Sequence, residues 1–389
     1  MRNKVYIVFF WGLIPLWTFA QGVKITHGPY LQAVGENEVT IVWTTDVDAV
    51  SWVELAPGGN ESFYASERPA YFQTKDGNRT VGKLHKITVP GLTKGTEYRY
   101  RAFSKAVLRY QGQSDVLYGN VASTNVYSRK PLRFRTLDAG KEDIAFTVVN
   151  DIHGRIRDLE ALTGNALYGR RDLVIFNGDM VSEMEDETTF FAGFMDDAVR
   201  LFASETPVFY SRGNHETRGK FNIHFSSYFP TSTDKLYYSF RQGPVLFIVL
   251  DSGEDKPDSD IEYSGLSQFD AYRGEQQAWL KTVLQSDDFR TAAYRMVIVH
   301  IPPVDSDWHG SIDVREKFLP ILNNAGITAM FCGHTHRYNC LEAGSQHDFP
   351  ILINATNTAL EVRADKAGMT VSRKDTDGKE LNSFRYTAK

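Results

Sequence analysis

Five short apolar runs in the second part of the chain are each followed directly by polar residues that can bind metal ions. The runs are rich in β-branched and aromatic side chains, which predicts strands buried on both faces of an α/β sheet. They cover residues 144–149, 173–177, 207–212, 296–300 and 327–332. Ligands of open α/β folds gather where the carboxyl ends of strands meet. The pattern therefore predicts one composite site, assembled from the ends of five strands.

Residues 22–136 follow a different pattern, which predicts an all-β domain. Strand-like runs such as 38–45, 85–92 and 97–103 are separated by Pro and Gly, and no segment there has a helical period. Residues 104–130, rich in Ser, Gly, Asn and Tyr, are interpreted as a long insertion before the last strand.

A short polar segment, residues 137–143, is predicted to link this domain to a second one that covers residues 144–389. In the second domain the strands alternate with helical segments such as 186–203 and 273–286, which is typical of a layered α/β domain. Residues 369–386 are predicted to form a β-hairpin.

Residues 1–20 are typical of an export signal. Arg2 and Lys4 precede an apolar stretch over residues 5–19, and small residues follow it. That stretch is shorter than the ~20 residues that a membrane span needs. We therefore expect export to a periplasm or the extracellular space and no membrane span in the mature chain; an uncleaved anchor helix is the alternative.

The composition limits the classes of partner. The 389 residues carry a formal net charge of −5, which argues against a general nucleic-acid-binding protein. A small anionic substrate remains compatible, because bound metal ions can supply local positive charge. With only two cysteines, a disulfide framework is not expected to hold the fold together. The sequence does not indicate an oligomeric state.

The polar clusters offer carboxylate, imidazole and amide ligands and no thiolate. The candidate metal ligands are Asp151, His153, Asp179, Asn214, His300, His334 and His336. In an extended segment, residues two apart point to the same side, so Asp151 with His153 can present two ligands to one place. This ligand set suits Mn, Fe, Zn or Co better than Ca. Seven ligands are too many for one transition metal and suit two ions that share a bridging carboxylate.

Taken together, the clusters resemble the calcineurin-like metallophosphoesterases. That family has the pattern D-x-H, G-D, G-N-H-E/D, a lone His after a strand, and G-H-x-H, and all five occur here in this order. The whole chain resembles the branch that carries a purple-acid-phosphatase-type N-terminal domain. Within that domain, Trp43 in mid-strand and the segment 92–98, which ends in Tyr98, resemble a fibronectin type III module and its tyrosine corner.

The resemblance implies an N-terminal all-β sandwich, fibronectin III-like, followed by an α/β metallophosphatase domain of two β-sheets flanked by helices. It also implies a role for each ligand. Asp151, His153 and His336 would hold one metal ion, and Asn214, His300 and His334 the second, with Asp179 as the bridge. A hydroxide held between the ions would attack phosphorus, and His215 would act as an acid or charge stabiliser at the phosphoryl group.

The implied activity is metal-dependent hydrolysis of a small phosphorylated substrate, with phosphomonoesters favoured over phosphodiesters. The alternatives are a phosphodiesterase with the same metal core, an inactive binding or adhesion protein, and a nuclease, which the acidic charge disfavours. Besides Asn214, the residues expected near substrate are Arg155, which could pair with phosphate, and His309. A surface salt bridge and a solvated loop histidine are the respective alternatives.

One position departs from the related families. Ser182 stands where purple acid phosphatases have a Tyr that ligates ferric iron and where Ser/Thr protein phosphatases have an Asp. We therefore expect no iron–tyrosinate chromophore. The group that orients His215 stays open among Glu183, Glu185 and Asp186. The acidic stretch 251–260 is expected to be a solvated loop near the mouth of the site.

Overall fold

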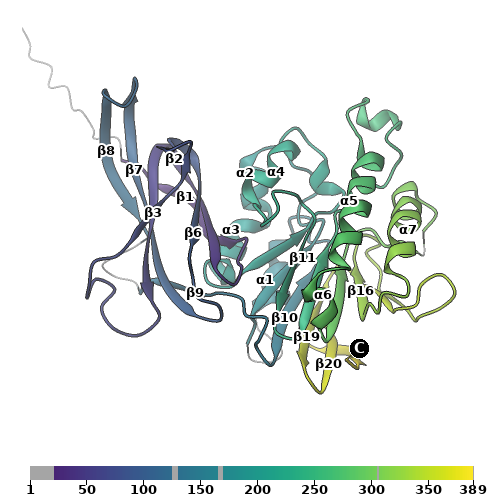
Figure 1. Cartoon of the computed structure of the whole chain (residues 1–389). Coiled ribbons are helices and arrows are strands. Elements are labelled where there is room, and N and C mark those ends of the chain that lie inside the picture. The colour runs from purple at the N-terminus through teal and green to yellow at the C-terminus, as the bar shows by residue number, and fades with distance from the viewer. Residues whose placement is uncertain (1–21, 125–129, 165–169, 305, 389) are drawn as a thin grey trace, which may run out of the picture.

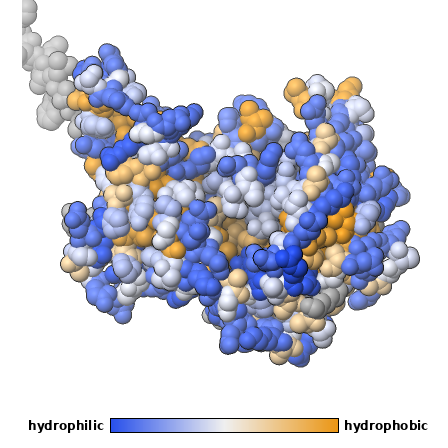
Figure 2. Space-filling model, viewed as in Figure 1, coloured by the Kyte–Doolittle hydropathy of each residue, from blue (hydrophilic) through white to orange (hydrophobic). Residues whose placement is uncertain are grey.

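The computed structural model describes residues 22–124, 130–164, 170–304 and 306–388, so the predicted export signal lies outside the described residues. Two parts are visible in Figure 1, an all-β part and a larger α/β part. Among the described residues, no helix is long and apolar enough to cross a membrane. The face shown in Figure 2 is mostly hydrophilic, and the hydrophobic residues on it form small separate groups.

Within residues 22–124 and 130–136, the N-terminal part contains nine strands. They are β1 (Ile25–Gln32), β2 (Glu38–Pro57), β3 (Ala70–Phe72), β4 (Thr74–Lys75), β5 (Asn78–Arg79), β6 (Gly82–Pro90), β7 (Glu97–Tyr110), β8 (Val116–Ser123) and β9 (Leu132–Arg135). The long strand β2 belongs to two layers, because its first half pairs with β1 and β6 and its second half pairs with β3 and β7. Residues of both halves, such as Trp43 and Val53, share one core.

Two expectations for this part are met in detail. Trp43 is fully buried, and the hydroxyl of Tyr98 accepts a hydrogen bond from the backbone nitrogen of Thr93 at 2.9 Å, as a tyrosine corner requires. The expected insertion is largely a β-hairpin, because β7 continues to Tyr110 and pairs with β8. The assignment to the fibronectin type III fold itself stays a prediction.

The α/β part contains two six-stranded sheets, ordered β12-β11-β10-β19-β20-β21 and β13-β14-β15-β16-β18-β17. Their strands are β10 (Ile144–Val149), β11 (Leu173–Asn177), β12 (Val208–Ser211), β13 (Tyr238–Gln242), β14 (Val245–Val249), β15 (Tyr294–Ile298), β16 (Ala329–Cys332), β17 (Asn339–Leu341), β18 (Ile351–Ile353), β19 (Thr358–Asp365), β20 (Gly368–Asp375) and β21 (Glu380–Tyr386). The five predicted site strands and the C-terminal hairpin are therefore all present.

Helices cover the outer faces of the two sheets. The α-helices are α1 (Ile156–Gly164), α2 (Glu187–Phe190), α3 (Asp196–Ala198), α4 (Phe225–Tyr228), α5 (Phe269–Val283), α6 (Asp287–Thr291) and α7 (His309–Leu322). Short π and 3-10 segments are η1 (Phe191–Met195), η2 (Val199–Ala203), η3 (His215–Thr217), η4 (Asn222–His224) and η5 (Ile261–Tyr263). One core lies between the sheets and two others lie between a sheet and its helices, so the prediction of two sheets flanked by helices is confirmed.

The two parts are joined by buried contacts as well as by the chain. The Tyr30 hydroxyl donates to the Tyr228 carbonyl at 2.9 Å, and the Tyr100 hydroxyl donates to the Ser204 carbonyl at 2.7 Å. The predicted linker is packed at its start, where Leu137 is 4% exposed, and exposed farther on, at Gly140 and Glu142. The boundaries of the two domains stay a prediction.

Candidate metal centre

The five loops that carry the predicted ligands come together at one place. They follow β10, β11 and β12, which are parallel neighbours in one sheet, and β15 and β16, which are parallel neighbours in the other. Ligand atoms of Asp151, His153, Asp179 and His336 lie within 4.8 Å of one another, and so do those of Asp179, His300 and His334. Asp179 belongs to both groups.

The backbone turns sharply at these positions. Five of the candidate ligands have positive φ: Asp151 (53°), His153 (48°), Asp179 (55°), His334 (72°) and His336 (58°). Non-glycine residues avoid this region because it costs of order 1–3 kcal/mol each, and such strain gathers at functional sites. Gly213 permits a close approach as well, since a Cβ there would lie 2.5 Å from the Asp179 nitrogen.

In the first group, hydrogen bonds fix the Asp151 carboxylate. Its Oδ2 accepts from the His334 backbone nitrogen at 3.0 Å and from Asn150 Nδ2 at 2.6 Å. Its Oδ1 is buried without a hydrogen-bond partner and lies 3.2 Å from His336 Nε2. His153 Nε2 faces His336 Nε2 at 3.1 Å. One carboxylate oxygen and two imidazole nitrogens thus converge.

In the second group, the His300 ring is held through its far nitrogen. His300 Nδ1 donates to the Asn177 carbonyl at 2.7 Å, which leaves Nε2 buried, without a hydrogen-bond partner and 3.0 Å from Asp179 Oδ2. A hydrogen bond of this kind fixes the tautomer of a metal-binding histidine. His334 Nδ1 lies 3.0 Å from the Asn214 side-chain oxygen. All seven predicted ligands are therefore brought together.

The spacing of these atoms fits transition-metal ions. Metal–nitrogen bonds of about 2.1 Å place adjacent ligand atoms about 3.0–3.4 Å apart in octahedral or tetrahedral geometry. The closest pairs lie 3.0–3.2 Å apart, and the buried atoms left without hydrogen bonds, Asp151 Oδ1 and His300 Nε2, belong to them. The residues present fit a pair of ions on either side of Asp179.

The electrostatics of the metal-free site are polarised. Burial opposes ionisation of Asp151, but the close approach of the His153 and His336 imidazoles holds its pKa well below the usual range. Burial lowers the pKa of His300, but the Asp179 and Asp151 carboxylates outweigh it and raise that pKa to about 10. Burial, followed by the charge of His300, lowers the pKa of His334 to about 4. A bound cation would take the place of the proton on His300.

His215 lies beside this centre and is oriented by the backbone. Its Nδ1 donates to the Ser182 carbonyl at 2.6 Å. Among the described residues, none of the side chains of Glu183, Glu185 and Asp186 hydrogen-bonds to the ring. The sequence left the orienting group open, and it is a main-chain atom, which no side-chain pattern could identify.

Glu216 is a functional residue to which the sequence analysis gave no role. This fully buried carboxylate accepts backbone N–H groups of Asp179 (2.9 Å), Met180 (2.6 Å) and Gly213 (2.9 Å), and the Tyr210 hydroxyl at 2.9 Å. It therefore ties the loop after β11 to the loop after β12. The signal was available, because Glu216 is the last residue of the third cluster.

A hollow of ≈ 390 Å³ lies over the centre. It is lined by Asp179, Asn214, His215, Arg218, Asp255, Lys256, Ser306, Trp308, His334, Thr335 and His336. Arg218 and Lys256 bring positive charge to its wall; Arg218 pairs with Glu254 through two hydrogen bonds of 2.9 and 3.0 Å, and Lys256 pairs with Glu262 at 2.7 Å. The sequence analysis missed both cations.

The acidic stretch 251–260 is only partly as expected. Asp255 and Lys256 do lie at the mouth of the hollow. However, residues 251–255 are buried rather than solvated, because ion pairs compensate their charge: Asp251 pairs with Arg212 at 2.9 Å, and Glu254 pairs with Arg218. The prediction of a solvated loop was wrong for this half of the stretch.

The two other predicted substrate residues make intramolecular contacts. Arg155 donates to Asp158 at 2.8 Å and to the Asp151 carbonyl at 2.5 Å, so it supports the backbone of a candidate ligand. His309 Nε2 lies 2.7 Å from Asp270 Oδ1, and neither residue lines the hollow; the neighbouring Trp308 does. Contact of Arg155 or His309 with substrate stays a prediction.

Comparison with known proteins points to the same family as the ligand clusters do. A sequence model of the calcineurin-like phosphoesterase family matches residues 144–338. Purple acid phosphatase 23 of Arabidopsis thaliana is 24% identical over 358 residues, which cover 77% of this chain and 70% of the relative. The serine/threonine-protein phosphatase CPPED1 of Danio rerio is 25% identical over 217 residues, which cover 53% of this chain and 66% of the relative. The chain thus spans about two thirds of the length of these relatives.

Among solved structures, the purple acid phosphatase PPD1 from yellow lupin (Lupinus luteus) seeds shares the fold. The two superpose with a TM-score of 0.65 at 14% sequence identity, and the match covers 92% of this chain and 73% of that one. The likeness extends over both parts of the chain, which agrees with a two-domain layout.

Proposed function

The chain belongs to the calcineurin-like phosphoesterase family, a family of metal-dependent phosphoric ester hydrolases, and on that premise we propose that it is an exported phosphatase with a dinuclear centre. The observation that carries the proposal is the position of Asp179, which is shared by two groups of ligand atoms. One carboxylate between two groups of imidazoles is the arrangement that two-metal hydrolases use. Mn, Fe, Zn and Co all suit this ligand set.

The chemistry divides between the ions and the chain. Bound ions would acidify a water molecule and offset the charge on the phosphoryl oxygens. The protein supplies the leaving-group chemistry: the Nδ1 proton of His215 is committed to Ser182, so Nε2 is the nitrogen left for the substrate. In the imidazolium form, which carries a proton on both nitrogens, the ring would donate the Nε2 proton to the departing alkoxide and become neutral.

The hollow supports a small, anionic substrate. Arg218 and Lys256 line the hollow, each paired with a glutamate, and would offer N–H groups to a phosphate. Phosphomonoesters are favoured by analogy with the named purple acid phosphatase relatives. Export is supported by the charged and apolar pattern of residues 1–20, and a fibronectin type III identity of the N-terminal domain by Trp43 and Tyr98.

The proposal is tested by hydrolysis after reconstitution with each metal in turn. p-Nitrophenyl phosphate is expected to be hydrolysed with a larger kcat/KM than bis(p-nitrophenyl) phosphate. Asp179→Asn should abolish turnover of both, whereas Asp115→Asn, a matched change in the β7–β8 hairpin, should leave it unchanged. A preference for the diester would overturn the monoesterase assignment. Full activity of Asp179→Asn would overturn the proposal as a whole.

A further inference from the structure

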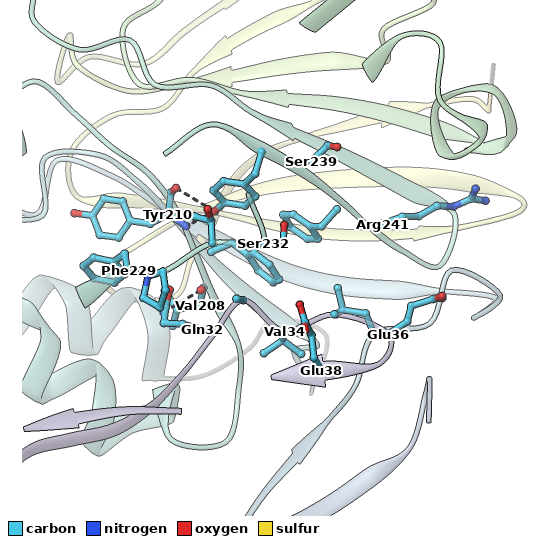
Figure 3. Close-up of a pocket in the computed structure, with 18 of the residues that line it drawn as sticks. Gln32, Val34, Glu36, Glu38, Val208, Tyr210, Phe229, Ser232, Ser239 and Arg241 are labelled. Atoms are coloured by element: carbon cyan, nitrogen blue, oxygen red, sulfur yellow. Dashed lines mark hydrogen bonds between the residues drawn. The ribbon is translucent and has the colours of Figure 1, made fainter. Parts of the chain in front are cut away.

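A second cavity, of ≈ 230 Å³, lies between the two domains. Figure 3 shows Val34 and Glu38 of the N-terminal domain on one side of it and Val208, Tyr210 and Ser232 of the α/β domain on the other. None of the described residues that line this cavity also lines the hollow above the candidate metal centre. The cavity is therefore a separate site.

The walls of the cavity are apolar and aromatic. Val34 is 3% exposed, and the ring of Phe209 stacks on that of Phe240 with centroids 3.7 Å apart. The polar atoms of the tyrosines are already used, because the Tyr238 hydroxyl bonds to both the nitrogen and the carbonyl of Tyr210. Both faces of the Phe240 ring are covered, by Phe209 and by Phe247, so the walls offer apolar side-chain surface rather than a free face of that ring. This surface suits a ligand with an apolar body of about one ring.

The lining of the cavity carries excess negative charge. The charged residues that line it are Glu36, Glu38, Arg241 and Asp288. Arg241 is compensated by Asp288 at 3.5 Å and donates to the Gly243 carbonyl. Glu36 accepts a backbone hydrogen bond from Ala139 at 2.8 Å. No hydrogen bond or ion pair holds the half-buried Glu38 carboxylate among the described residues, which leaves it available for a ligand.

We propose that this cavity binds a small organic ammonium compound with a single aromatic or branched aliphatic body. The body would fill the space between Val34 and the stacked pair of Phe209 and Phe240, and the ammonium group would pair with Glu38. The occupant would contact both domains and stabilise their packing, because a ligand that binds only the folded state raises the stability of that state.

The test uses isothermal titration calorimetry and thermal unfolding of the full-length protein, with 2-phenylethylammonium as the probe. We expect saturable binding of one molecule per chain and a rise in Tm. The neutral analogue 2-phenylethanol should bind about tenfold more weakly, a difference of about 1.4 kcal/mol, and the anion 3-phenylpropionate should not bind. These three probes share one ring and differ in charge.

Variants test whether the probe binds in this cavity. Glu38→Gln should weaken binding of the cation about tenfold and leave that of the alcohol unchanged, whereas Glu67→Gln, an exposed carboxylate outside the cavity, should change neither. Val34→Trp should fill the cavity and abolish binding; Ser232→Phe, on the α/β side of the cavity, takes its place if Val34→Trp does not fold. Asp179→Asn should bind the cation as the wild type does, which separates this proposal from the proposed phosphatase activity.

Three outcomes would overturn the proposal. The first is equal affinity for the ammonium compound and the alcohol, because charge would then play no part. The second is unchanged binding of the cation to both Glu38→Gln and a folded cavity-filling variant. The third is the absence of saturable binding in the millimolar range.

Discussion

The imidazole of His215 is oriented by the main-chain carbonyl of Ser182, with Nδ1 and the oxygen 2.6 Å apart. Related families have a side chain with a function of its own at the position of Ser182, either a metal-ligating Tyr or an Asp that orients the catalytic histidine. In this chain the loop after β11 orients His215 through a backbone carbonyl, in place of such an Asp side chain. The side chain of Ser182 takes no part in this hydrogen bond.

This hydrogen bond predicts that substitution of Ser182 has little effect on kcat and that substitution of His215 has a large one. Ser182→Ala keeps the carbonyl, so kcat should stay within about twofold of the wild type, whereas His215→Asn should lower kcat by about 10²–10³-fold, as expected for loss of a general acid. The loss should be larger for phenyl phosphate than for p-nitrophenyl phosphate, because the poorer leaving group needs the proton more. An equal loss for the two esters would argue against an acid role.

Glu216 is predicted to act as a positioning residue. Glu216→Gln replaces an acceptor of backbone N–H groups with an amide that turns donor hydrogens toward them, so metal affinity should fall about 10–100-fold. Tyr210→Phe removes only one of its hydrogen bonds and should cost about 1 kcal/mol of stability. Competition titrations with a metal chelator and thermal unfolding measure the two effects. Glu216→Gln with wild-type metal affinity would refute the assigned role.

The close approach at Gly213 gives a steric prediction. A Cβ there would lie 2.5 Å from the Asp179 nitrogen and closer still to its carboxylate, so Gly213→Ala should displace Asp179 and remove nearly all bound metal. Gly164→Ala is the matched control, because no atom lies within 4 Å of a Cβ at that position. Metal analysis of the two variants makes the comparison, and equal metal content would contradict the geometry.

The stability of the protein is expected to depend on pH because His85 is buried in the N-terminal domain. Burial lowers the pKa of His85 to about 4, whereas the unfolded imidazole takes up a proton below about 6.5. Between pH 4 and 6.5 the His85 imidazole stays neutral in the folded chain but is protonated in the unfolded chain. The free energy of unfolding is therefore unaffected above pH 6.5 and falls as the pH drops from 6.5 to 4. The contribution of this one group reaches about 3 kcal/mol at the lower limit.

The contribution of His85 is measured by comparing the free energy of unfolding of the wild type and of His85→Gln between pH 4 and 7. The variant should be less stable at pH 7, where it loses packing and the contact with Thr45. Its stability should fall less steeply between pH 6.5 and 4. Parallel curves would show that another group causes the acid sensitivity.

The sequence predicted which polar side chains converge, because the clusters follow strands, and strand ends converge in this fold class; their role as metal ligands stays a prediction. It also predicted Tyr98 as a corner residue, because the segment before it is a local pattern. Three features escaped it: the Ser182 carbonyl has no side-chain signature, Arg218 and Lys256 reach the hollow through tertiary packing, and the burial of residues 251–255 depends on ion pairs with arginines distant in sequence. Local patterns were readable, whereas pairings formed only on folding were not.

If two metal ions share the Asp179 carboxylate, the metal content of the chain depends on this one residue. Plasma mass spectrometry of the purified, metal-loaded protein should find about two transition-metal ions per chain. In Asp179→Asn the number should fall to one or less, while Asp115→Asn should retain both. Two tightly bound ions in Asp179→Asn, or a single ion in the wild type at saturating metal, would contradict the shared carboxylate.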